Sequence, residues 1–358
     1  MSKRYVFFIA TLGKGGAERV VSVLTRKMAE EGLNVEILLY MDRDVFYDID
    51  SRIKITKVQA ETKSNNLIKN IIWMRKFFKE RADAVISFLA PFNMMCICSL
   101  MFSHIPLVVA DRSDPRQIPA NKFLRKLRNF LYRFSDGVVV QTQNNRAYFS
   151  KFIQKKSSVI ANPVDLNDKN GQALSTVKEK EIVTAGRLIK AKNQALLISA
   201  FAEIHKEFPE YRLIIYGDGN QKENLEEMVD KLELTDYIKL PGNQKDIFDK
   251  ISKAELFVLS SDCEGMPNAL LEAMCLGLPV ISTKVSGATD VIVDGESGLL
   301  VDCGSVGQMA DAIRLMITDA ELRNKCAENA THLAERLTVD KIYRQWMDVC
   351  ESVEKGKE

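Results

Sequence analysis

SSDCEGMPNALLEAMCLGLP, residues 260–279, holds two carboxylates, Glu264 and Glu272, on either side of a predicted helix start. Pro267 between them suits the first position of a helix, where its missing N–H group is not needed. The apolar run at 269–276 continues the helix, and the glycine and proline that follow it are typical of a helix end. The stretch therefore predicts a strand end, a polar loop that holds Glu264, and a helix that carries Glu272.

The start of such a helix suits a ligand that carries phosphate. Its first N–H groups have no partner within the helix and lie at the positive end of the helix dipole. A phosphate binds well at this position, and a carboxylate on each side accepts hydrogen bonds from hydroxyl groups. The alternative is a buried helix with two solvated or paired glutamates, and this stretch alone does not decide between the two.

Length and composition indicate a soluble protein of two domains. The chain has 358 residues, of which 46% are hydrophobic and 27% are charged. Its net charge of +2 gives no reason to expect a nucleic-acid partner. It contains no apolar run long enough to span a membrane, and its first residues lack the pattern of a signal peptide.

The cysteines and histidines argue against a metal site. The seven cysteines form no CxxC pair, which is typical of scattered thiols in a reducing compartment. The chain has three histidines, which are few ligands for a histidine-based metal site. We therefore expect no metal and no cofactor, and a cytoplasmic location.

The first half of the chain predicts a parallel sheet covered by helices on both faces. Residues 5–10 are typical of a buried strand, residues 17–28 have helical spacing, and residues 35–40 form another strand pattern. Strands and helices continue to alternate beyond this point. Further strands are expected at 53–58, 84–88, 106–110, 137–141 and 157–161, with helices near 67–81, 92–103, 120–134 and 143–152.

A glycine-rich loop follows the first predicted strand. Gly13, Gly15 and Gly16 would let the backbone approach a ligand closely. The loop does not complete a dinucleotide fingerprint, because Glu18 stands where the third glycine would be. A tight turn is the alternative interpretation of this loop.

Two other loops at predicted strand ends carry polar groups. One contains Asn93, and the other, at 111–115, contains Arg112. Ligands of doubly wound sheets bind at the carboxyl ends of the strands. A turn with an internal salt bridge explains residues 111–115 equally well.

Two predicted helices, 120–134 and 69–81, combine aromatic and basic residues. One interpretation is an apolar side in the core and a solvated basic side. The other is a helix that docks on an anionic membrane surface, where each cation contributes about 1 kcal/mol. In 120–134 the apolar side is expected to comprise Phe123, Leu124, Leu127, Phe130, Leu131 and Phe134, and the solvated side Lys122, Arg125, Lys126, Arg128 and Arg133.

The alternation breaks at 162–178, which is polar and poor in apolar residues. We therefore predict a first domain at 1–165 and a second at 166–337, each with one doubly wound sheet. A final helix at about 338–358 is expected to pack back on the first domain. In the second half, strands are expected near 181–185, 211–216, 237–240, 255–260, 278–282 and 298–301, with helices near 192–208, 219–233, 244–252, 267–276, 305–318 and 319–335.

The first loop of the second half, AGRLIKAKNQ, contains Gly186, Arg187 and Lys192. Two cations beyond the carboxyl end of a strand are suited to neutralise a diphosphate. Taken singly they are ordinary surface charges, but the loop that holds Glu264 belongs to the same predicted sheet. Gly217 and Asn243, at two other strand ends, could frame a base and a ribose or simply form turns.

These motifs together resemble family 4 of the retaining glycosyltransferases, which have two Rossmann-like domains in the GT-B arrangement. The resemblance extends over nearly the whole chain, and its paired-glutamate motif is the most specific part. It implies transfer of a sugar from a nucleotide-diphosphate donor without a metal. The motifs are GKGGAERV at 13–20, ANPVD at 161–165, AGRLIKAKN at 185–193, YGDG at 216–219 and EGMPNALLEAMCLGLPV at 264–280.

The resemblance also implies roles for individual residues. Arg187 and Lys192 would hold the diphosphate and stabilise the leaving group, which makes them catalytic together with Glu264. Glu264 would contact the hydroxyls of the donor sugar, and Glu272 those of the ribose. Further donor contacts are expected from Gly15, Gly16, Gly186, Gly217, Asn243, Gly265, Met266, Pro267, Asn268, Ala269 and Leu270.

One residue departs from the pattern of many members of the family. They carry a histidine beside the donor sugar where this sequence has Arg112, so the contact with the sugar is open. An Arg-Ser-Asp-Pro sequence at this place is similar to a subset that acts in surface polysaccharide assembly. We expect Asn93 and Arg112 to contact the acceptor or the sugar.

The resemblance implies a hexose or N-acetylhexosamine donor, with UDP as the nucleotide, and a glycan or polyprenyl-diphosphate-linked acceptor. Retention would proceed by front-face attack, because no carboxylate stands out as a nucleophile. A lipid-linked acceptor would give the basic helices a purpose at the inner face of the cell membrane. The alternatives are a nucleotide-sugar epimerase of the same architecture and a binding protein without turnover.

Overall fold

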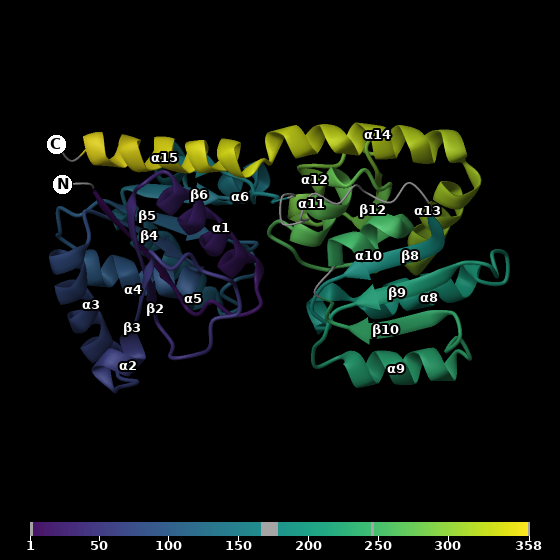
Figure 1. Cartoon of the computed structure of the whole chain (residues 1–358), viewed down its shortest axis with the longest axis horizontal. Coiled ribbons are helices and arrows are strands. Elements are labelled where there is room, and N and C mark those ends of the chain that lie inside the picture. Colours follow the sequence, from purple (N-terminus) through teal and green to yellow (C-terminus); the bar gives the residue numbers. More distant parts are fainter. Residues whose placement is uncertain (1–2, 166–177, 245–246, 357–358) are drawn as a thin grey trace. The chain divides into compact units, whose positions relative to one another are not determined.

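The structure is a computed structural model that describes residues 3–165, 178–244 and 247–356. Its contacts divide the chain into two compact units, Met1–Pro163 with Leu337–Glu358, and Val164–Arg336 (Figure 1). The segment in which the sequence analysis placed the domain boundary falls largely outside the described residues.

The first unit contains a seven-stranded sheet in the order β3-β2-β1-β4-β5-β6-β7, in which every described pairing is parallel. The strands are β1 (Arg4–Ile9), β2 (Asn34–Leu39), β3 (Lys54–Lys57), β4 (Ala84–Phe88), β5 (Leu107–Asp111), β6 (Gly137–Val140) and β7 (Ser157–Val159). The helices are α1 (Gly16–Glu30), α2 (Val58–Thr62), α3 (Leu67–Arg81), α4 (Ala90–Leu100), α5 (Lys122–Leu131) with the 3₁₀ turn η1 (Tyr132–Phe134), α6 (Gln143–Tyr148) and α7 (Lys151–Lys155).

The central strands of this sheet are buried on both faces. β4, β5 and β6 are buried at every position, as expected for parallel strands covered by helices. On one face, the ring of Phe8 packs edge-on against Phe78 and Phe92, which extend from α3 and α4. The carboxyl ends of these strands therefore carry the loops in which the site residues of this unit are found.

The final helix, α15 (Val339–Lys355), packs on the first unit. It contacts α1, β5 and β6 (Figure 1). Trp346 stacks on Phe88 of β4 with ring centroids 5.5 Å apart. Asp340 forms an ion pair of 2.8 Å with Lys27 of α1. Apolar stacking and an ion pair thus attach the end of the chain to its first sheet.

The second unit contains a six-stranded parallel sheet in the order β10-β9-β8-β11-β12-β13. The strands are β8 (Glu179–Ala185), β9 (Arg212–Tyr216), β10 (Ile238–Gly242), β11 (Ala254–Leu259), β12 (Val280–Thr283) and β13 (Leu299–Val301). The helices are the 3₁₀ turn η3 (Lys190–Lys192), α8 (Gln194–Ile204), α9 (Lys222–Lys231), α10 (Ile247–Lys253), α11 (Asn268–Cys275), α12 (Ser286–Thr289), α13 (Val306–Thr318) and α14 (Ala320–Arg336).

The two parallel sheets confirm the predicted α/β fold class, and three of the predicted helices differ in detail. The helix expected at 143–152 is two helices, because Phe149 is buried in an extended conformation between α6 and α7. Pro267 caps α11 from outside and is not its first residue. Finally, the side of α5 that was expected to be buried is partly exposed: Arg128 is fully buried, whereas Phe123 and Phe130 are exposed.

Candidate functional site

The loops that follow β8 and β11 lie side by side in the second unit. The two strands are neighbours and parallel, so their carboxyl ends meet at the same edge of the sheet. The backbone N–H of Asp262 donates to the carbonyl of Ala191 at 2.9 Å, and Ser260 Oγ donates to the carbonyl of Lys192 at 3.1 Å. Asn193 Nδ2 also donates to Asp262 Oδ1 at 3.0 Å. These bonds hold the two loops in register.

This register brings Lys192 and Glu264 together. Lys192 Nζ forms an ion pair with Glu264 Oε1, which also accepts a hydrogen bond of 2.7 Å from Ser261 Oγ. The two charged side chains are only 20% and 11% exposed, respectively. The lysine side chain passes beside Gly186, where an added Cβ would lie 3.8 Å from Lys192 Cε. A cation and a carboxylate thus share one partly buried position beside the sheet edge.

Helix α11 begins immediately beyond this pair. Pro267 is its N-cap and provides no side-chain hydrogen bond, and the N–H groups of Leu270 and Leu271 donate to the Pro267 carbonyl at 3.1 and 3.2 Å. The N–H of Leu270, which the sequence analysis assigned to a ligand, is therefore engaged within the first turn. Glu272 lies one turn further along and is 6% exposed.

A short helix that the sequence analysis missed supports the loop before α11. Gly287 of α12 lies so close to this loop that an added Cβ would be 2.5 Å from the carbonyl oxygen of Gly265 and 2.6 Å from Met266 Cα. The only sequence signal was a glycine soon after the end of a strand. α12 therefore fixes the backbone that presents Glu264.

Arg187 lies on the same loop as Lys192, but its side chain is exposed. Its carbonyl accepts a hydrogen bond of 3.1 Å from Gln194 Nε2, which fixes the backbone of the loop. Among the described residues its guanidinium has no hydrogen-bond or ion-pair partner. The structure thus places both predicted cations on one loop and pairs only Lys192 with a carboxylate.

The loops after β9 and β10 meet the same edge of the sheet. Gly217 has φ +136°, and an added Cβ there would lie 1.9 Å from the carbonyl oxygen of Gly186. Its N–H donates to the Gly242 carbonyl at 3.0 Å, and the following Asn243 is exposed. Only a glycine allows this close approach, which brings the ends of β8, β9 and β10 together at one edge of the sheet.

In the first unit, Gly15 is the N-cap of α1 and Gly16 is its first residue. Tyr47 Oη donates to the Gly15 carbonyl at 2.9 Å. The carboxylate of Glu18 folds back over Gly15, where an added Cβ would lie 2.1 Å from Glu18 Oε2. A phosphate at this helix start would have to displace that carboxylate.

Asn93 and Arg112 are both buried in the first unit. Asn93 Nδ2 donates to the Ala110 carbonyl and to Tyr132 Oη at 2.9 Å each, and Asn93 Oδ1 accepts from Ser87 Oγ at 2.8 Å. These bonds occupy its amide within the core, so the geometry does not support a direct contact between Asn93 and an acceptor.

The Arg112 guanidinium is turned into the protein. It donates to Asn162 Oδ1 and, at 3.4 Å, to the Ile160 carbonyl. Burial lowers the pKa of Arg112 to about 9, and the neighbouring carboxylate of Asp111 opposes this shift. Arg112 therefore ties its loop to residues 160–162, which follow β7.

A buried ion pair that the sequence pattern did not predict lies beside Arg112. Arg128 Nη1 lies 3.4 Å from Asp111 Oδ2, and both side chains are almost completely buried. Arg128 also donates to the carbonyls of Ile118 and Pro115 at 2.6 and 2.9 Å. The helical pattern had indicated a solvated arginine, but this side chain holds the loop at 112–119 in place.

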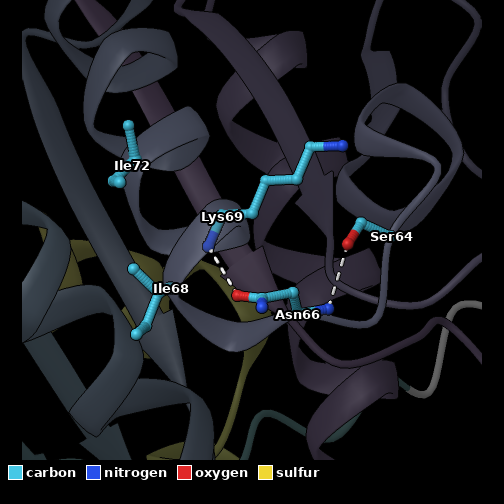
Figure 2. A pocket seen from close by; sticks show the side chains of 5 residues that line it. All are labelled: Ser64, Asn66, Ile68, Lys69 and Ile72. Carbon is cyan, nitrogen blue, oxygen red and sulfur yellow. Dashed lines mark hydrogen bonds between the residues drawn. The ribbon is translucent and has the colours of Figure 1, made fainter.

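A separate open pocket of about 500 Å³ lies at the start of α3 (Figure 2). Asn66 caps this helix by accepting a hydrogen bond from the N–H of Lys69 at 3.0 Å, and exposed Ile68 and Ile72 form the apolar side of the pocket. Its fifth lining residue is Ser64. None of the predicted site residues lines this pocket.

Two further features of the described residues bear on metal and membrane binding. They include no group of three or more histidine, cysteine, aspartate or glutamate side chains arranged to hold a metal ion. No helix among them is both long enough and apolar enough to cross a bilayer.

Sequence comparisons assign both halves of the chain to glycosyltransferases. The family described as "Glycosyltransferase Family 4" matches residues 14–168, and the family described as "Glycosyl transferases group 1" matches residues 167–333. The two matches adjoin each other and together span most of the chain.

Curated relatives match nearly the whole chain. An alpha-1,4-N-acetyl-D-galactosaminyltransferase of Campylobacter jejuni, named for an undecaprenol-diphosphate-linked glycan acceptor, is 29% identical over 97% of this chain and 98% of its own length. An amylovoran biosynthesis glycosyltransferase of Erwinia amylovora is 24% identical over 98% of this chain and 99% of its own length.

Solved structures show the same fold at lower identity. HepE of Anabaena, solved with UDP and glucose, superposes with a TM-score of 0.81 at 20% identity and covers 98% of this chain and 100% of its own. A sucrose-phosphate synthase of Thermosynechococcus elongatus gives a TM-score of 0.82 at 16% identity over 99% of this chain and 100% of its own. The chain therefore belongs to the glycosyltransferases of family 4 and group 1, and it has their GT-B fold.

Proposed function

We propose that this glycosyltransferase moves a sugar from a nucleotide-diphosphate donor to a lipid-linked glycan in cell-surface polysaccharide biosynthesis. The observation that carries this proposal is the Lys192–Glu264 pair, held between the loops after β8 and β11 at the start of α11. A cation, a carboxylate and a helix start at one sheet edge suit the phosphate and the hydroxyl groups of a sugar nucleotide.

The donor diphosphate would bind between Lys192 and the exposed guanidinium of Arg187. In the structure Lys192 is neutralised by Glu264, so an incoming diphosphate gives the lysine a second anionic partner. Glu264 then accepts hydrogen bonds from the sugar hydroxyls, and Glu272 accepts them from the ribose. Because Lys192 is mostly buried, its attraction for charge on the leaving diphosphate is weakly screened by water, which favours the transition state.

The reaction would retain the anomeric configuration and need no metal. Two cations at the diphosphate supply positive charge that a bound metal would otherwise provide. We infer front-face attack, in which the leaving diphosphate takes the proton of the acceptor hydroxyl. Both points rest on membership of the family and on the residues of the second unit.

The donor sugar is proposed to be a hexose or N-acetylhexosamine carried by UDP. The names of full-length relatives support N-acetylhexosamine transfer to polyprenyl-diphosphate-linked glycans, and one relative is named for amylovoran biosynthesis. Such an acceptor lies at the membrane, so the enzyme would work as a peripheral protein on its inner face. Arg112 would serve this reaction by holding its loop, since its guanidinium is bonded to Asn162 and Ile160.

A transfer assay tests the proposal. Purified protein is incubated with UDP-N-acetylhexosamines and UDP-hexoses and with a polyprenyl-diphosphate-linked glycan, and both UDP and the extended glycan are measured. Lys192→Ala and Glu264→Ala should each lower the rate by roughly a hundredfold or more, since each removes charge or hydrogen bonding at the transition state. Lys190→Ala is the matched control, because Lys190 is an exposed cation on the same 3₁₀ turn and should leave the rate near that of the wild type.

Analysis of the donor after incubation without acceptor, and thermal unfolding with and without donor, separate the alternative functions. An isomer of the donor that forms without acceptor would identify an epimerase. Stabilisation by donors without any turnover would identify a binding protein. Full activity in both site variants would refute the assignment of the site.

A further inference from the structure

Four phenylalanine rings are exposed on neighbouring elements of the first unit. Phe123 and Phe130 of α5 are 71% and 54% exposed, and Phe152 of α7 is 54% exposed. Phe134 of η1 lies 5.5 Å from Phe130 between ring centroids, and η1 contacts both α5 and α7. Phe123 and Phe130 are seven residues apart in one helix, so they share a face. The four rings thus lie on three elements that are linked through η1, and we call their exposed side the α5–α7 surface.

Cations surround these rings. From Arg112 to Ile160, both included, the chain contains two acidic residues, Asp114 and Asp136, and eleven lysines and arginines. The net charge of the whole protein is +2, so this segment is strongly basic while the rest of the chain is acidic on balance. The exposed cations on the three elements are Lys122, Lys126, Arg133, Lys151 and Lys155.

Contacts within the first unit hold the elements of this surface in place. Arg133 and Lys156 both lie over the Phe152 ring, with 5.4 Å from the guanidinium carbon and from Nζ to its centroid. Lys156 Nζ also donates to the carbonyls of Arg133 and Ser135, which ties α7 to η1. Below the rings, Tyr132 and Ile153 are buried in the core. The exposed rings therefore project from elements that the core already holds.

We propose that the α5–α7 surface docks the protein on an anionic lipid bilayer. Phenylalanine rings with lysines and arginines at their edge suit the boundary between acyl chains and acidic headgroups. A second copy of the chain fits poorly, because two such basic faces would repel each other. The inference deepens the proposed function by naming the surface that would bring the enzyme to a lipid-linked acceptor, and its test needs neither donor nor acceptor.

Vesicle binding tests the proposal directly. The protein is sedimented with vesicles of phosphatidylcholine and phosphatidylglycerol, and with vesicles of phosphatidylcholine alone. We expect binding to the anionic vesicles that weakens as salt is raised. The triple variant Lys122→Gln/Lys126→Gln/Lys151→Gln should bind roughly a hundredfold more weakly, since each cation near the surface accounts for about a fivefold change.

Apolar contact is tested by Phe123→Ser/Phe130→Ser. Each ring is already exposed, so the fold should persist, while vesicle binding should fall by roughly tenfold per ring. The matched control is Lys206→Gln/Lys231→Gln/Lys239→Gln, which removes three exposed lysines from the second unit and should leave binding unchanged.

Several results would overturn the proposal. These are no binding to anionic vesicles at low salt, equal binding to neutral vesicles, or an equal loss in the control variant. Self-association in solution that the phenylalanine variant abolishes would assign the surface to a second copy instead. Vesicle binding without sugar transfer would leave this inference standing and refute the proposed function, and transfer to the polyprenyl-diphosphate-linked glycan in detergent without vesicle binding would do the reverse.

Discussion

Replacing Arg128 by methionine should destabilise the first unit in a way that depends on pH. The substitution keeps the length of the side chain but removes the guanidinium that lies 3.4 Å from Asp111 Oδ2. It also removes the hydrogen bonds of 2.6 and 2.9 Å to the carbonyls of Ile118 and Pro115. The carboxylate of Asp111, which is 1% exposed, would then be buried without its cation.

The loss in the free energy of unfolding that we expect for Arg128→Met has two parts. Losing charged hydrogen bonds to buried carbonyls should cost about 2 kcal/mol at any pH. Leaving the buried Asp111 carboxylate without its ion-pair partner adds about 2 kcal/mol at pH 8, so that the total falls in the range found for broken buried ion pairs. At pH 5 the second part should largely disappear, because the carboxyl of Asp111 can then be buried as the neutral acid.

The direction of this pH dependence follows from the pKa of Asp111. Burial raises it to about 6 from the ordinary value of 3.8, and the Arg128 guanidinium opposes this rise. A carboxyl whose pKa is raised by folding contributes stability that is fully present below pH 4 and is lost as the pH rises through 6. Without Arg128 the folded-state pKa rises further, so the variant keeps losing stability, relative to the wild type, up to pH 8.

Urea unfolding at pH 5 and pH 8, followed by tryptophan fluorescence, measures this difference. Both tryptophans of the chain, Trp73 and Trp346, belong to the first unit, so their signal reports that unit alone. Lys126→Met on the same helix is the matched control, since Lys126 is exposed and its replacement should change the free energy of unfolding by less than about 0.5 kcal/mol.

A double variant isolates the pair. In an Asp111→Asn background, Arg128→Met should cost about 2 kcal/mol at both pH values, because residue 111 then has no carboxylate that could lose its cation. An equal loss of stability in Arg128→Met at pH 5 and pH 8, or a loss as small as that in Lys126→Met, would refute a buried ion pair between Arg128 and Asp111.

Two further predictions concern packing. Gly217→Ala should destabilise the second unit by about 3 kcal/mol and abolish stabilisation by the donor, because the new Cβ would lie 1.9 Å from the Gly186 carbonyl oxygen at a strained φ. The control is Gly304→Ala, whose new Cβ has nothing within 4 Å and which should cost about 1 kcal/mol. Unfolding followed by circular dichroism measures both losses. Trp346→Ala should cost the first unit about 4 kcal/mol by losing its stack on Phe88, as followed by the remaining tryptophan. A loss below 1 kcal/mol would show that α15 does not support that unit.

The sequence predicted the parallel sheets well because their signal is local. Buried parallel strands are continuous apolar runs, and the helices between them show regular spacing, so both can be found without tertiary information. The motif at 264–280 was equally readable, since its loop and helix start depend on neighbouring residues. The ion pair of Lys192 with Glu264 could be anticipated only from strand order, because the two residues are far apart in the chain.

The orientation of α5 shows what the sequence left open. Its pattern identifies which side chains share a face, but it does not say which face meets the rest of the protein. The structure buries Arg128 against Asp111 and leaves Phe123 and Phe130 in solvent. Periodicity along a chain determines the faces of an element, whereas the groups packed against each face determine its burial, and those groups come from distant parts of the chain.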